Sequence, residues 1–598
     1  MLTVNPRSKE SLVVAFFLIS GLLLAAAAAP AQLLPEQRRA DFEQLAALVS
    51  RAYAPYEWKR ERFGNDALRI APWLERVRAA QSDLEYFEIC AEYLAGLRDL
   101  HTGFTLPSDF VAEIPLGADL YDGRALIDTI NRAELPADRY PFEVGDEVVS
   151  VDGESAAAWI DRTARLQSFA DDRATRRWAL DQLFFRAQAA LPSAPRIGAS
   201  ARVVVKRRAT GALESYDIPW LISGTPFTVS GPIPFPQANA TLMEAAPDPS
   251  DSWRRSVEAF ADRSPPRFKR LRRFGSVFPA FEPPDGFRPR QGQVAGSLVF
   301  SGAYPAGGYT IGLLRIPAFP TSQFAQATML RIIDTELAFF RDNVDGLVVD
   351  VTRNPGGSVC LTNEILRRFI PVPFRTVADE FRPTWEIVQL FRQDVEDAKF
   401  LNASPATIAV LEGFLKDVET AYYEFRGRTG PIPACGLSLD LTPLPGYAGP
   451  MLVLIDEFSA SSADAFPAVL QDNNRALMFG RTTAGGGGLS VSRPIGPYGE
   501  ASAALSVTLG IRPRTTQIPG LPSTNTLENN GAWPDIEADI MTEENLLSGG
   551  RPFVEAFTRA MIEHIERSRA PLTEAAPGRA TRAVRSMPGG PSAKAPER

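Results

Sequence analysis

The sequence has few residues that could bind a metal. It contains only two histidines, His101 and His564, which argues against a histidine-rich metal site. Its three cysteines, Cys90, Cys360 and Cys435, fit no metal-ligand spacing. An odd count leaves at least one thiol free. Cys360 and Cys435 could pair, but a buried, inert thiol is the default expectation for each cysteine.

Excess positive charge is also absent. The formal net charge of the chain is −8, so nothing indicates a nucleic-acid partner. Two short basic runs, 206–208 and 269–273, are typical of solvated surface.

Only one apolar run, at residues 11–29, approaches the length of a membrane span. Arg7 and Lys9 precede it, and Ala29-Pro30-Ala31 follows as an Ala-x-Ala-like cleavage site. This pattern predicts a secretory signal peptide over 1–31, and therefore a secreted or periplasmic protein with no stable membrane span after its removal. A retained membrane anchor is the alternative.

A chain of 598 residues is too long for one hydrophobic core, and we expect two or three domains. Residues 32–107 have helical apolar spacing, with a capping box at Ser82 and Glu85. Residues 108–222 predict a small α+β domain. The segment 223–300 is predicted to be a Pro/Gly-rich linker or insertion, 301–569 a further domain, and 570–598 a disordered tail.

The pattern within 301–569 predicts an α/β sheet. Strand, helix and strand are expected at 310–316, 323–341 and 346–351, and again at 451–455, 462–471 and 477–480. Loops at 352–357, 456–461 and 480–488 each leave the end of a buried strand. Loops of this kind form ligand sites at one rim of a sheet.

Ser461 lies where a predicted strand turns into a helix. The helix dipole and the free N–H groups there favour a developing oxyanion. The alternative is that Ser459 or Ser461 caps the helix, with Asp464 in its first turn, and these residues alone favour the cap. The paired glycines Gly356 and Gly357 after the neighbouring strand allow close backbone approach to a ligand, which favours a catalytic role.

These loops resemble those of the tail-specific, or C-terminal processing, family of serine peptidases, which includes the tricorn-like and chlamydial protease-like activity factor branch. Residues 350–357 match its D-x-R-x-N-P-G-G loop, except for Thr352 at the arginine position. Residues 459–464 match its S-A-S-A-S-E element, whose middle serine is the nucleophile and maps to Ser461. Residues 145–153 resemble its PDZ-like domain, although the expected carboxylate-binding loop at 115–118 matches weakly. The resemblance implies an α/β catalytic domain with a crotonase-like βαβ sheet, an N-terminal helical module and a PDZ-like α+β domain.

One departure from the family pattern concerns the general base. The processing branch uses a lysine whose position maps to Gly486, and no lysine lies between Lys416 and Lys594. The tricorn-like branch uses a distant histidine in an L-x-D-x-H-T motif, which residues 97–102 resemble. That histidine maps to His101, for which the alternative is a histidine satisfied at a helix C-terminus. His564 has the pattern of a surface residue on a terminal helix.

A histidine base needs an orienting partner. Residues 528–535 resemble the branch's E-N-x-G-V-x-P-D segment, and its glutamate maps to Glu528. The alternative is a solvated loop carboxylate.

The resemblance implies an exported serine endopeptidase that acts on proteins or peptides through an acyl-enzyme, without metal or cofactor. Ser461 would attack, His101 would transfer the proton, and the N–H groups of Ser462 and of Gly356 or Gly357 would hold the oxyanion. The alternative is an inactive homologue that binds peptides through its PDZ-like domain and cleft. An unrelated esterase is disfavoured because the chain has no Gly-x-Ser-x-Gly elbow.

Overall fold

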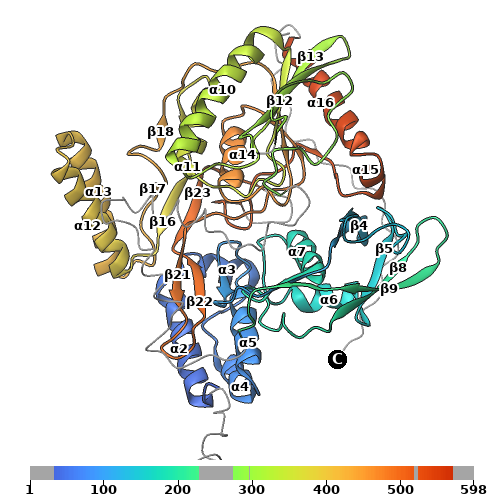
Figure 1. Ribbon diagram of the computed structural model, residues 1–598. Helices are drawn as coiled ribbons and strands as arrows, with labels where there is room; N and C mark the ends of the chain where they lie inside the picture. Colours follow the sequence, from blue (N-terminus) through green and yellow to red (C-terminus); the bar gives the residue numbers. More distant parts are fainter. Residues whose placement is uncertain (1–31, 228–273, 295, 518–522, 570–598) are drawn as a thin grey trace, which may run out of the picture.

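The computed structural model describes residues 32–227, 274–294, 296–517 and 523–569 (Figure 1). The predicted signal peptide, most of the predicted linker and the predicted tail lie outside these ranges. Within them, no helix combines the length and apolar character needed to cross a bilayer.

The chain begins with the predicted helical module. Its helices are α2 (Pro35–Ala52), α3 (Tyr56–Phe63), α4 (Ala71–Ala79) and α5 (Asp83–Ala95). Ser82 caps α5, because its hydroxyl accepts a hydrogen bond from the Glu85 N–H at 3.2 Å. The helix ends at Ala95, shortly before His101.

The second unit is the α+β domain. A sheet of β3 (Leu116–Tyr121), β4 (Arg124–Ile130), β5 (Glu147–Val151), β8 (Ser200–Lys206) and β9 (Leu213–Pro219) runs in that order, and β6 (Glu154–Ser155) pairs with β5. Two helices, α6 (Ala156–Thr163) and α7 (Asp172–Phe184), accompany it. A small sheet has the order β10 (Leu221–Ser223), β2 (Val111–Glu113), β7 (Phe185–Ala187).

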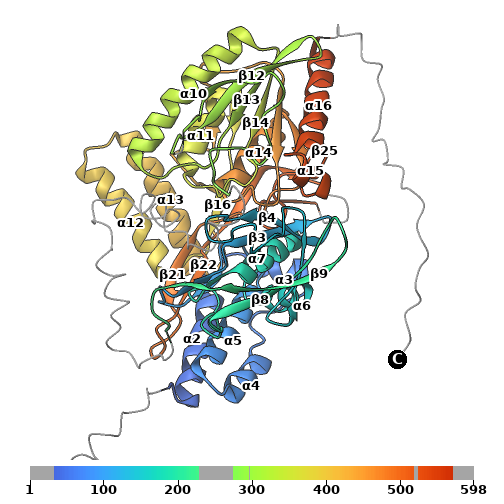
Figure 2. The ribbon, with the colours of Figure 1, turned by 45° about the vertical axis from the view of Figure 1, so that its right-hand side comes forward.

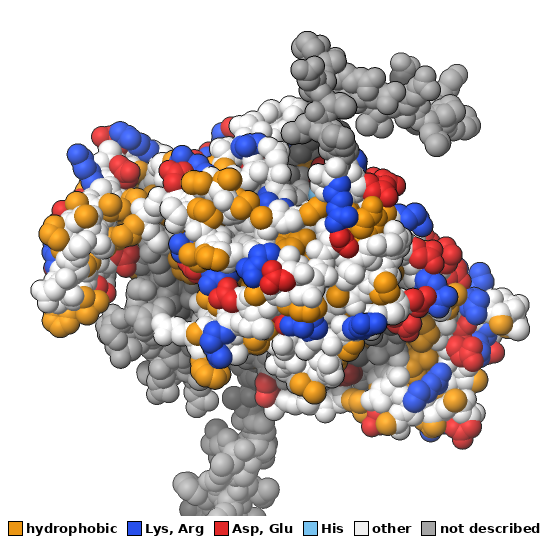
Figure 3. All heavy atoms as spheres, turned by 90° about the horizontal axis from the view of Figure 1, so that it is seen from above, with side chains coloured by type: hydrophobic (Ala, Val, Ile, Leu, Met, Phe, Trp, Pro, Cys, Tyr) orange, Lys and Arg blue, Asp and Glu red, His pale blue; other side chains and the backbone are white. Residues whose placement is uncertain are grey.

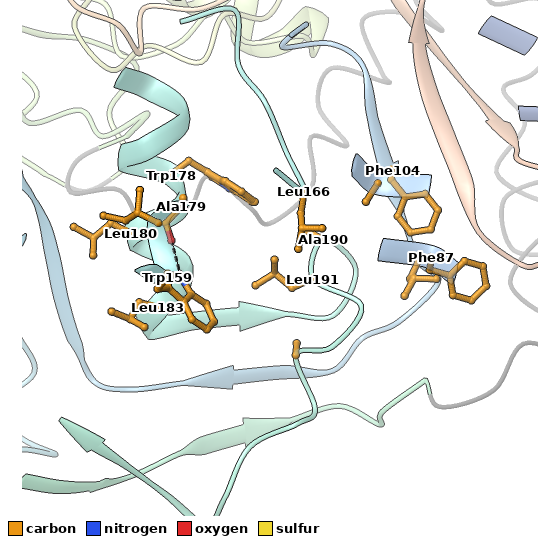
Figure 4. Packing of buried hydrophobic residues seen from close by; sticks show 14 of the residues in the cluster. Phe87, Phe104, Trp159, Leu166, Trp178, Ala179, Leu180, Leu183, Ala190 and Leu191 are labelled. Atoms are coloured by element: carbon orange, nitrogen blue, oxygen red, sulfur yellow. Dashed lines mark hydrogen bonds between the residues drawn. The ribbon is translucent and has the colours of Figure 1, made fainter. Parts of the chain in front are cut away.

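One hydrophobic core is shared by these first two units. Phe87 on α5 and Phe104 belong to the same buried cluster as Trp178 and Leu183 on α7. Figure 4 shows Leu166, Ala190 and Leu191 between these two groups of side chains, and the Trp159 indole N–H donating to the Ala179 carbonyl at 2.9 Å. The helical module is therefore packed against the α+β domain and does not hang free.

The third unit is built on a seven-stranded sheet. Its order is β11 (Arg288–Gln291), β12 (Phe300–Ala306), β13 (Tyr309–Arg315), β14 (Gly346–Asp350), β19 (Met451–Ile455), β20 (Leu477–Gly480) and β25 (Ile536–Glu537). The strands from β13 to β25 are parallel. Because β11 is part of this sheet, the domain starts before residue 301 and the predicted linker is shorter at its C-terminal end.

Helices cover both faces of this sheet (Figure 2). The helices α10 (Gln323–Asn343), α11 (Val359–Phe369) and α14 (Ser462–Asp472) pack on one face, where Val349 and Val453 point into their core. The long helix α16 (Arg551–Arg569), preceded by α15 (Glu543–Leu547), packs on the other, against Val348 and Leu454. Alternate residues of each strand thus face opposite layers, which explains why these strands are apolar throughout.

A projecting lobe interrupts the domain between α11 and β19. It contains the helices α12 (Trp385–Phe400) and α13 (Pro405–Tyr423), seen at the left of Figure 1. Short strands at its base are β15 (Phe374–Arg375) with β18 (Asp440–Leu441), and β17 (Ile432–Pro433) and β16 (Ala378–Phe381) with β23 (Thr508–Thr516) and β24 (Thr524–Thr526). Cys360 and Cys435 form a disulfide that ties α11 to this lobe, and Cys90 is free and buried.

A strand immediately after His101 joins the first unit to the third. This strand, β1 (Gly103–Thr105), pairs antiparallel with β22 (Ser502–Ser506), which in turn pairs with β21 (Ser490–Pro494). Phe104 lies opposite Ala503. The pairing fixes the end of the helical module against the catalytic domain, although the two strands are far apart in the sequence.

Basic and acidic side chains are interspersed on the face seen from above (Figure 3). This face carries no broad basic stripe of the kind that follows a nucleic-acid backbone.

Candidate active site

Ser461 occupies the turn between β19 and α14, at the carboxyl edge of the parallel sheet. Its backbone has φ 58° and ψ −117°, a conformation that is costly for a residue other than glycine. The Ser461 N–H donates to the Asp464 carboxylate at 2.7 Å. The Asp464 N–H donates in return to the Ser461 backbone carbonyl at 2.8 Å, so the two residues close the first turn of the helix.

Asp464 holds the turn of Ser461 against the loop that follows β20. Its two carboxylate oxygens also accept the N–H groups of Gly485 at 2.7 Å and Gly486 at 3.0 Å. Burial raises the pKa of Asp464 to about 7, opposed by these hydrogen bonds and by one from Thr483. The carboxylate therefore joins two of the three predicted loops.

Ser459 connects the turn of Ser461 to the third predicted loop, which follows β14, and it is not the helix cap. Its hydroxyl is fully buried and donates to the Val351 carbonyl at 2.8 Å. The Asp456 N–H donates to the same hydroxyl at 3.1 Å. Ser459 thereby fixes the ends of β14 and β19 relative to each other.

The paired glycines lie directly beside Ser461. A methyl group on Gly356 would come within 2.6 Å of the Ser461 Cβ, so a side chain there is excluded. The Gly356 N–H donates to the Asn354 side chain at 2.8 Å. The N–H groups of Gly357 and Ser462 donate to no described residue, while the Ser462 hydroxyl donates to the Gly357 carbonyl at 2.7 Å. Two unpaired backbone donors therefore lie next to each other at the turn of Ser461.

His101 is brought to this same loop cluster. A methyl group on Gly486 would lie 3.3 Å from the His101 Cε1 atom and 2.6 Å from Leu100. The Gly486 N–H shares the Asp464 carboxylate with the Ser461 N–H. The imidazole thus borders the loop that contacts the turn of Ser461, at the position where the processing branch would carry its lysine.

His101 is half-buried, and the carboxylate of Asp99 is bonded to its backbone. The backbone N–H of His101 donates to Asp99 at 2.8 Å, and the Tyr53 hydroxyl donates to the other Asp99 oxygen at 2.9 Å. The Nδ1 atom is buried and has no hydrogen-bond partner within the described residues. Burial lowers the pKa of His101 below its ordinary value, and Asp99 opposes this. This direction favours the neutral imidazole, which is the form that a general base requires.

Glu528 is not the solvated loop carboxylate of the alternative reading, because it is fully buried. One oxygen accepts the Gly487 N–H at 2.9 Å, and the other pairs with the ammonium of Lys59. Burial, followed by the charge of Asp99, raises the pKa of Glu528 to about 8, while Lys59 lowers it. No direct hydrogen bond from Glu528 to His101 is formed in the described part of the chain.

Lys59 is a component of the site that sequence reasoning missed. It lies on α3, in the helical module, and its side chain is 3% exposed. Lys59 lies outside the three loops that the sequence pattern indicates, and nothing in the local sequence of α3 distinguishes it. Asp99 and Asp464 were also missed, although both lie inside the motifs that carried the resemblance.

The remaining histidine lies away from this cluster. His564 is half-buried on α16, which covers the opposite face of the sheet from α14. Its pKa is lowered by burial and by Arg567. Across the described ranges, no three histidine, cysteine or acidic side chains gather as a metal site.

A buried ion-pair network reaches the turn of Ser461 from the α+β domain. Arg177 on α7 pairs with Asp119 on β3 at 2.6 Å and with Glu457 at 2.9 Å. Its guanidinium also lies over the Phe458 ring, 4.6 Å from the centroid. Glu457 and Phe458 precede Ser461 by only a few residues, so the network supports the loop of the candidate nucleophile.

Comparison with protein-family models decides the class of the enzyme. Residues 310–538 match the model of peptidase family S41, and residues 111–226 match a PDZ domain. The chain carries an S41 peptidase domain. The protein is a serine peptidase. Its N-terminal helical module, PDZ domain and S41 domain confirm the fold class predicted from the sequence.

Relatives that match over most of their length occur in Chlamydia. An uncharacterized protein of Chlamydia muridarum is 24% identical over 584 residues, covering 88% of this chain and 92% of its own. A protein of Chlamydia trachomatis is 25% identical over 594 residues, with the same coverage.

Solved structures share the fold. Mature CPAF complexed with lactacystin superimposes with a TM-score of 0.67 at 21% identity, covering 89% of this chain and 99% of that one. A second structure of mature CPAF gives the same TM-score at 20% identity, with coverage of 90% and 99%. The fold of this chain is therefore shared with these solved structures over most of its length.

Proposed function

We propose that this S41 peptidase hydrolyses peptide bonds with Ser461 as nucleophile and His101 as general base. The observation that carries the proposal is the place of the imidazole, which borders Gly486 in the loop held to the Ser461 turn by Asp464. A lysine at position 486 would meet the same space. Lys59 donates to three acceptors, which leaves it no free electron pair to serve as a base.

The reaction is acyl transfer. His101 accepts the proton of the Ser461 hydroxyl as its oxygen attacks the peptide carbonyl carbon, and the N–H groups of Gly357 and Ser462 stabilise the oxyanion. His101 then donates the proton to the leaving amine, and water releases the acyl group from Ser461. Gly357 is preferred to Gly356 as oxyanion donor, because the Gly356 N–H is occupied by Asn354.

Two carboxylates stabilise the imidazolium that forms during this step. Asp99 bonds the backbone of His101, and Glu528 is anchored to Gly487, the neighbour of the glycine that His101 contacts. Glu528 keeps the role of orienter in this proposal, and Asp99 joins it. Protein or peptide substrates follow from the peptidase and PDZ domains.

We also propose that the protein is exported, to the periplasm or the medium. The N-terminal apolar run and Ala-x-Ala site favour export. The Cys360–Cys435 disulfide fits an oxidising compartment. Sequencing of the native N-terminus should start near Gln32, whereas a cytoplasmic protein that retains Met1 would refute this part.

The function is tested by labelling with a fluorophosphonate probe, followed by mapping of the modified peptide. We expect modification of Ser461 and loss of both labelling and peptide hydrolysis in Ser461→Ala. Ser459→Ala is the matched control, since it removes a structural hydroxyl two residues away. It should cost about 1–3 kcal/mol of stability, because it leaves the Val351 carbonyl without its buried donor, but retain labelling. An unlabelled wild-type enzyme would favour the inactive peptide-binding homologue.

A further inference from the structure

Lys59 is a buried cation at the junction of the helical module and the S41 domain. The other lysines that the structure describes, 206, 399 and 416, are exposed. A buried ammonium is tolerated only when its protons are bonded and its charge is balanced. The groups around Lys59 must therefore offset the free-energy cost of burying its ammonium.

All three protons of the ammonium have acceptors. Lys59 donates to the Arg98 carbonyl at 2.7 Å, to the Asn529 side-chain oxygen at 2.8 Å and to the Glu528 carboxylate. An ammonium has three donors and no acceptor. Its hydrogen-bonding capacity is consequently filled by two turns from different domains.

These two turns carry the residues of the proposed base. Arg98 has φ 54° and lies three residues before His101, while Asn529 has φ 62° and directly follows Glu528. The Asn529 amide also donates to the Arg98 carbonyl at 3.0 Å. Strained backbone persists only where surrounding contacts hold it. Lys59 supplies one of these contacts to both turns.

Lys59 balances only one of the two negative charges that lie close to it. Glu528 faces the ammonium of Lys59, the carboxylate of Asp99 and the Gly487 N–H, and Asp99 faces the Tyr53 hydroxyl and the backbone of His101. Two carboxylates thus share one permanent cation. With both ionised, the group of Lys59, Asp99 and Glu528 carries one net negative charge. Proton transfer from Ser461 to His101 makes an imidazolium and brings the total to zero.

We propose that Lys59 is a positioning residue of the catalytic site, whose ammonium favours the ionised form of Glu528 and joins its turn to the Arg98 turn beside His101. The inference rests on the proposed function, because it assigns Lys59 a role toward the same base. Lys59 acts through Glu528 and does not touch the substrate.

The test measures the rate at which a fluorophosphonate phosphonylates Ser461, with loss of fluoride, between pH 6 and pH 10. Lys59→Met keeps the length of the side chain and removes its charge. Removing the cation raises the pKa of Glu528, so the ionised form requires a higher pH. We expect about a tenfold lower rate at pH 7, a rise of the rate shifted upward by about one pH unit, and recovery near pH 10.

Two further variants separate this role from a structural one. Lys399→Met removes an exposed ammonium that pairs with Glu412 at 3.0 Å, and it should leave the profile unchanged. Lys59→Met in a Glu528→Gln background should slow phosphonylation less than threefold relative to Glu528→Gln alone. This comparison also decides the matter if the single variant does not fold.

A loss in Lys59→Met that is equal at every pH would overturn the inference, as would an equally large loss in the Glu528→Gln background. His101→Ala separates this failure from failure of the proposed function. If His101→Ala is inactive while Lys59→Met behaves as wild type, only the role of Lys59 is wrong. If His101→Ala is phosphonylated at the wild-type rate, the proposed base is wrong.

Discussion

At the scale of single residues, burial sets the ionisation of the proposed base and its orienter. Burial lowers the pKa of His101 and raises that of Glu528 to about 8. An unperturbed histidine would give a pH profile that rises near 6.5. In this site burial favours the neutral imidazole, and Glu528 is the group that we expect to limit activity at acid pH.

The rate of peptide hydrolysis should therefore rise as the pH passes through about 8 and Glu528 loses its proton. The free energy of unfolding should fall as the pH rises. A carboxyl whose pKa is raised from 4.5 to about 8 binds its proton more tightly in the folded state, so its stabilising contribution is lost as pH rises between these values.

Glu528→Gln should remove the pH dependence of both activity and stability. Activity is measured as kcat/KM and stability as the free energy of urea unfolding, from pH 4.5 to above pH 8. A Glu528→Gln enzyme whose activity still rises through pH 8 would exclude Glu528 as the limiting group.

At the scale of elements, loops and one short strand bring the site together. Asp464 binds the loop after β20 to the start of α14, and Ser459 binds the end of β14 to the end of β19. The pairing of β1 with β22 then fixes the segment that carries His101. The absence of a side chain at Gly486 leaves room for the imidazole.

Gly486→Ala should therefore impair catalysis without unfolding the protein. The added methyl group would meet Leu100 at 2.6 Å and His101 at 3.3 Å, which displaces the imidazole by a few tenths of an ångström. We expect kcat to fall about tenfold. Gly413→Ala on α13 is the control, since a methyl group there meets nothing within 4 Å, and it should stabilise the helix by about 0.5–1 kcal/mol. Unchanged kcat in Gly486→Ala would show that the imidazole does not need this space.

The sequence predicted these elements unevenly. Buried strands such as β14 and β19 read as apolar runs, and the turn of Ser461 followed from small polar residues between a strand and a helix. The edge strand β11 was missed, because its Arg-Pro-Arg-Gln sequence has no apolar pattern. The approach of His101 to Gly486 depends on strand pairing between distant residues, which local patterns do not encode, and only the family resemblance anticipated it.

At the scale of the whole molecule, the three units form one structure around the site. The helical module shares its core with the PDZ domain and its last strand with the S41 domain. Arg177 carries the PDZ domain's contact to the loop before Ser461, through Asp119 and Glu457. The role of Lys59 could not be predicted from the sequence, because its hydrogen-bond partners come from different units and meet only in the folded protein.

Arg177→Met should destabilise the protein by about 3–5 kcal/mol, since it leaves the buried carboxylate of Asp119 without its ion-pair partner, whereas Glu457 keeps Arg173. Activity should also fall, because Glu457 precedes the turn of Ser461. Arg176→Met is the neighbouring control. Arg176 forms an exposed pair with Asp161, and its loss should cost about 0–1 kcal/mol. Urea unfolding of the two variants compares them, and equal unfolding free energies would contradict the supporting role of the buried network.

The central claim is that His101 and Ser461 act as one catalytic unit. It is tested most directly by the turnover of a peptide substrate in Ser461→Ala, His101→Ala and the double variant, each checked for folding by circular dichroism. We predict that either single substitution lowers kcat by a factor on the order of 10⁴ or more, and that the double variant loses little further. A His101→Ala enzyme with undiminished turnover, or losses that multiply in the double variant, would contradict the account.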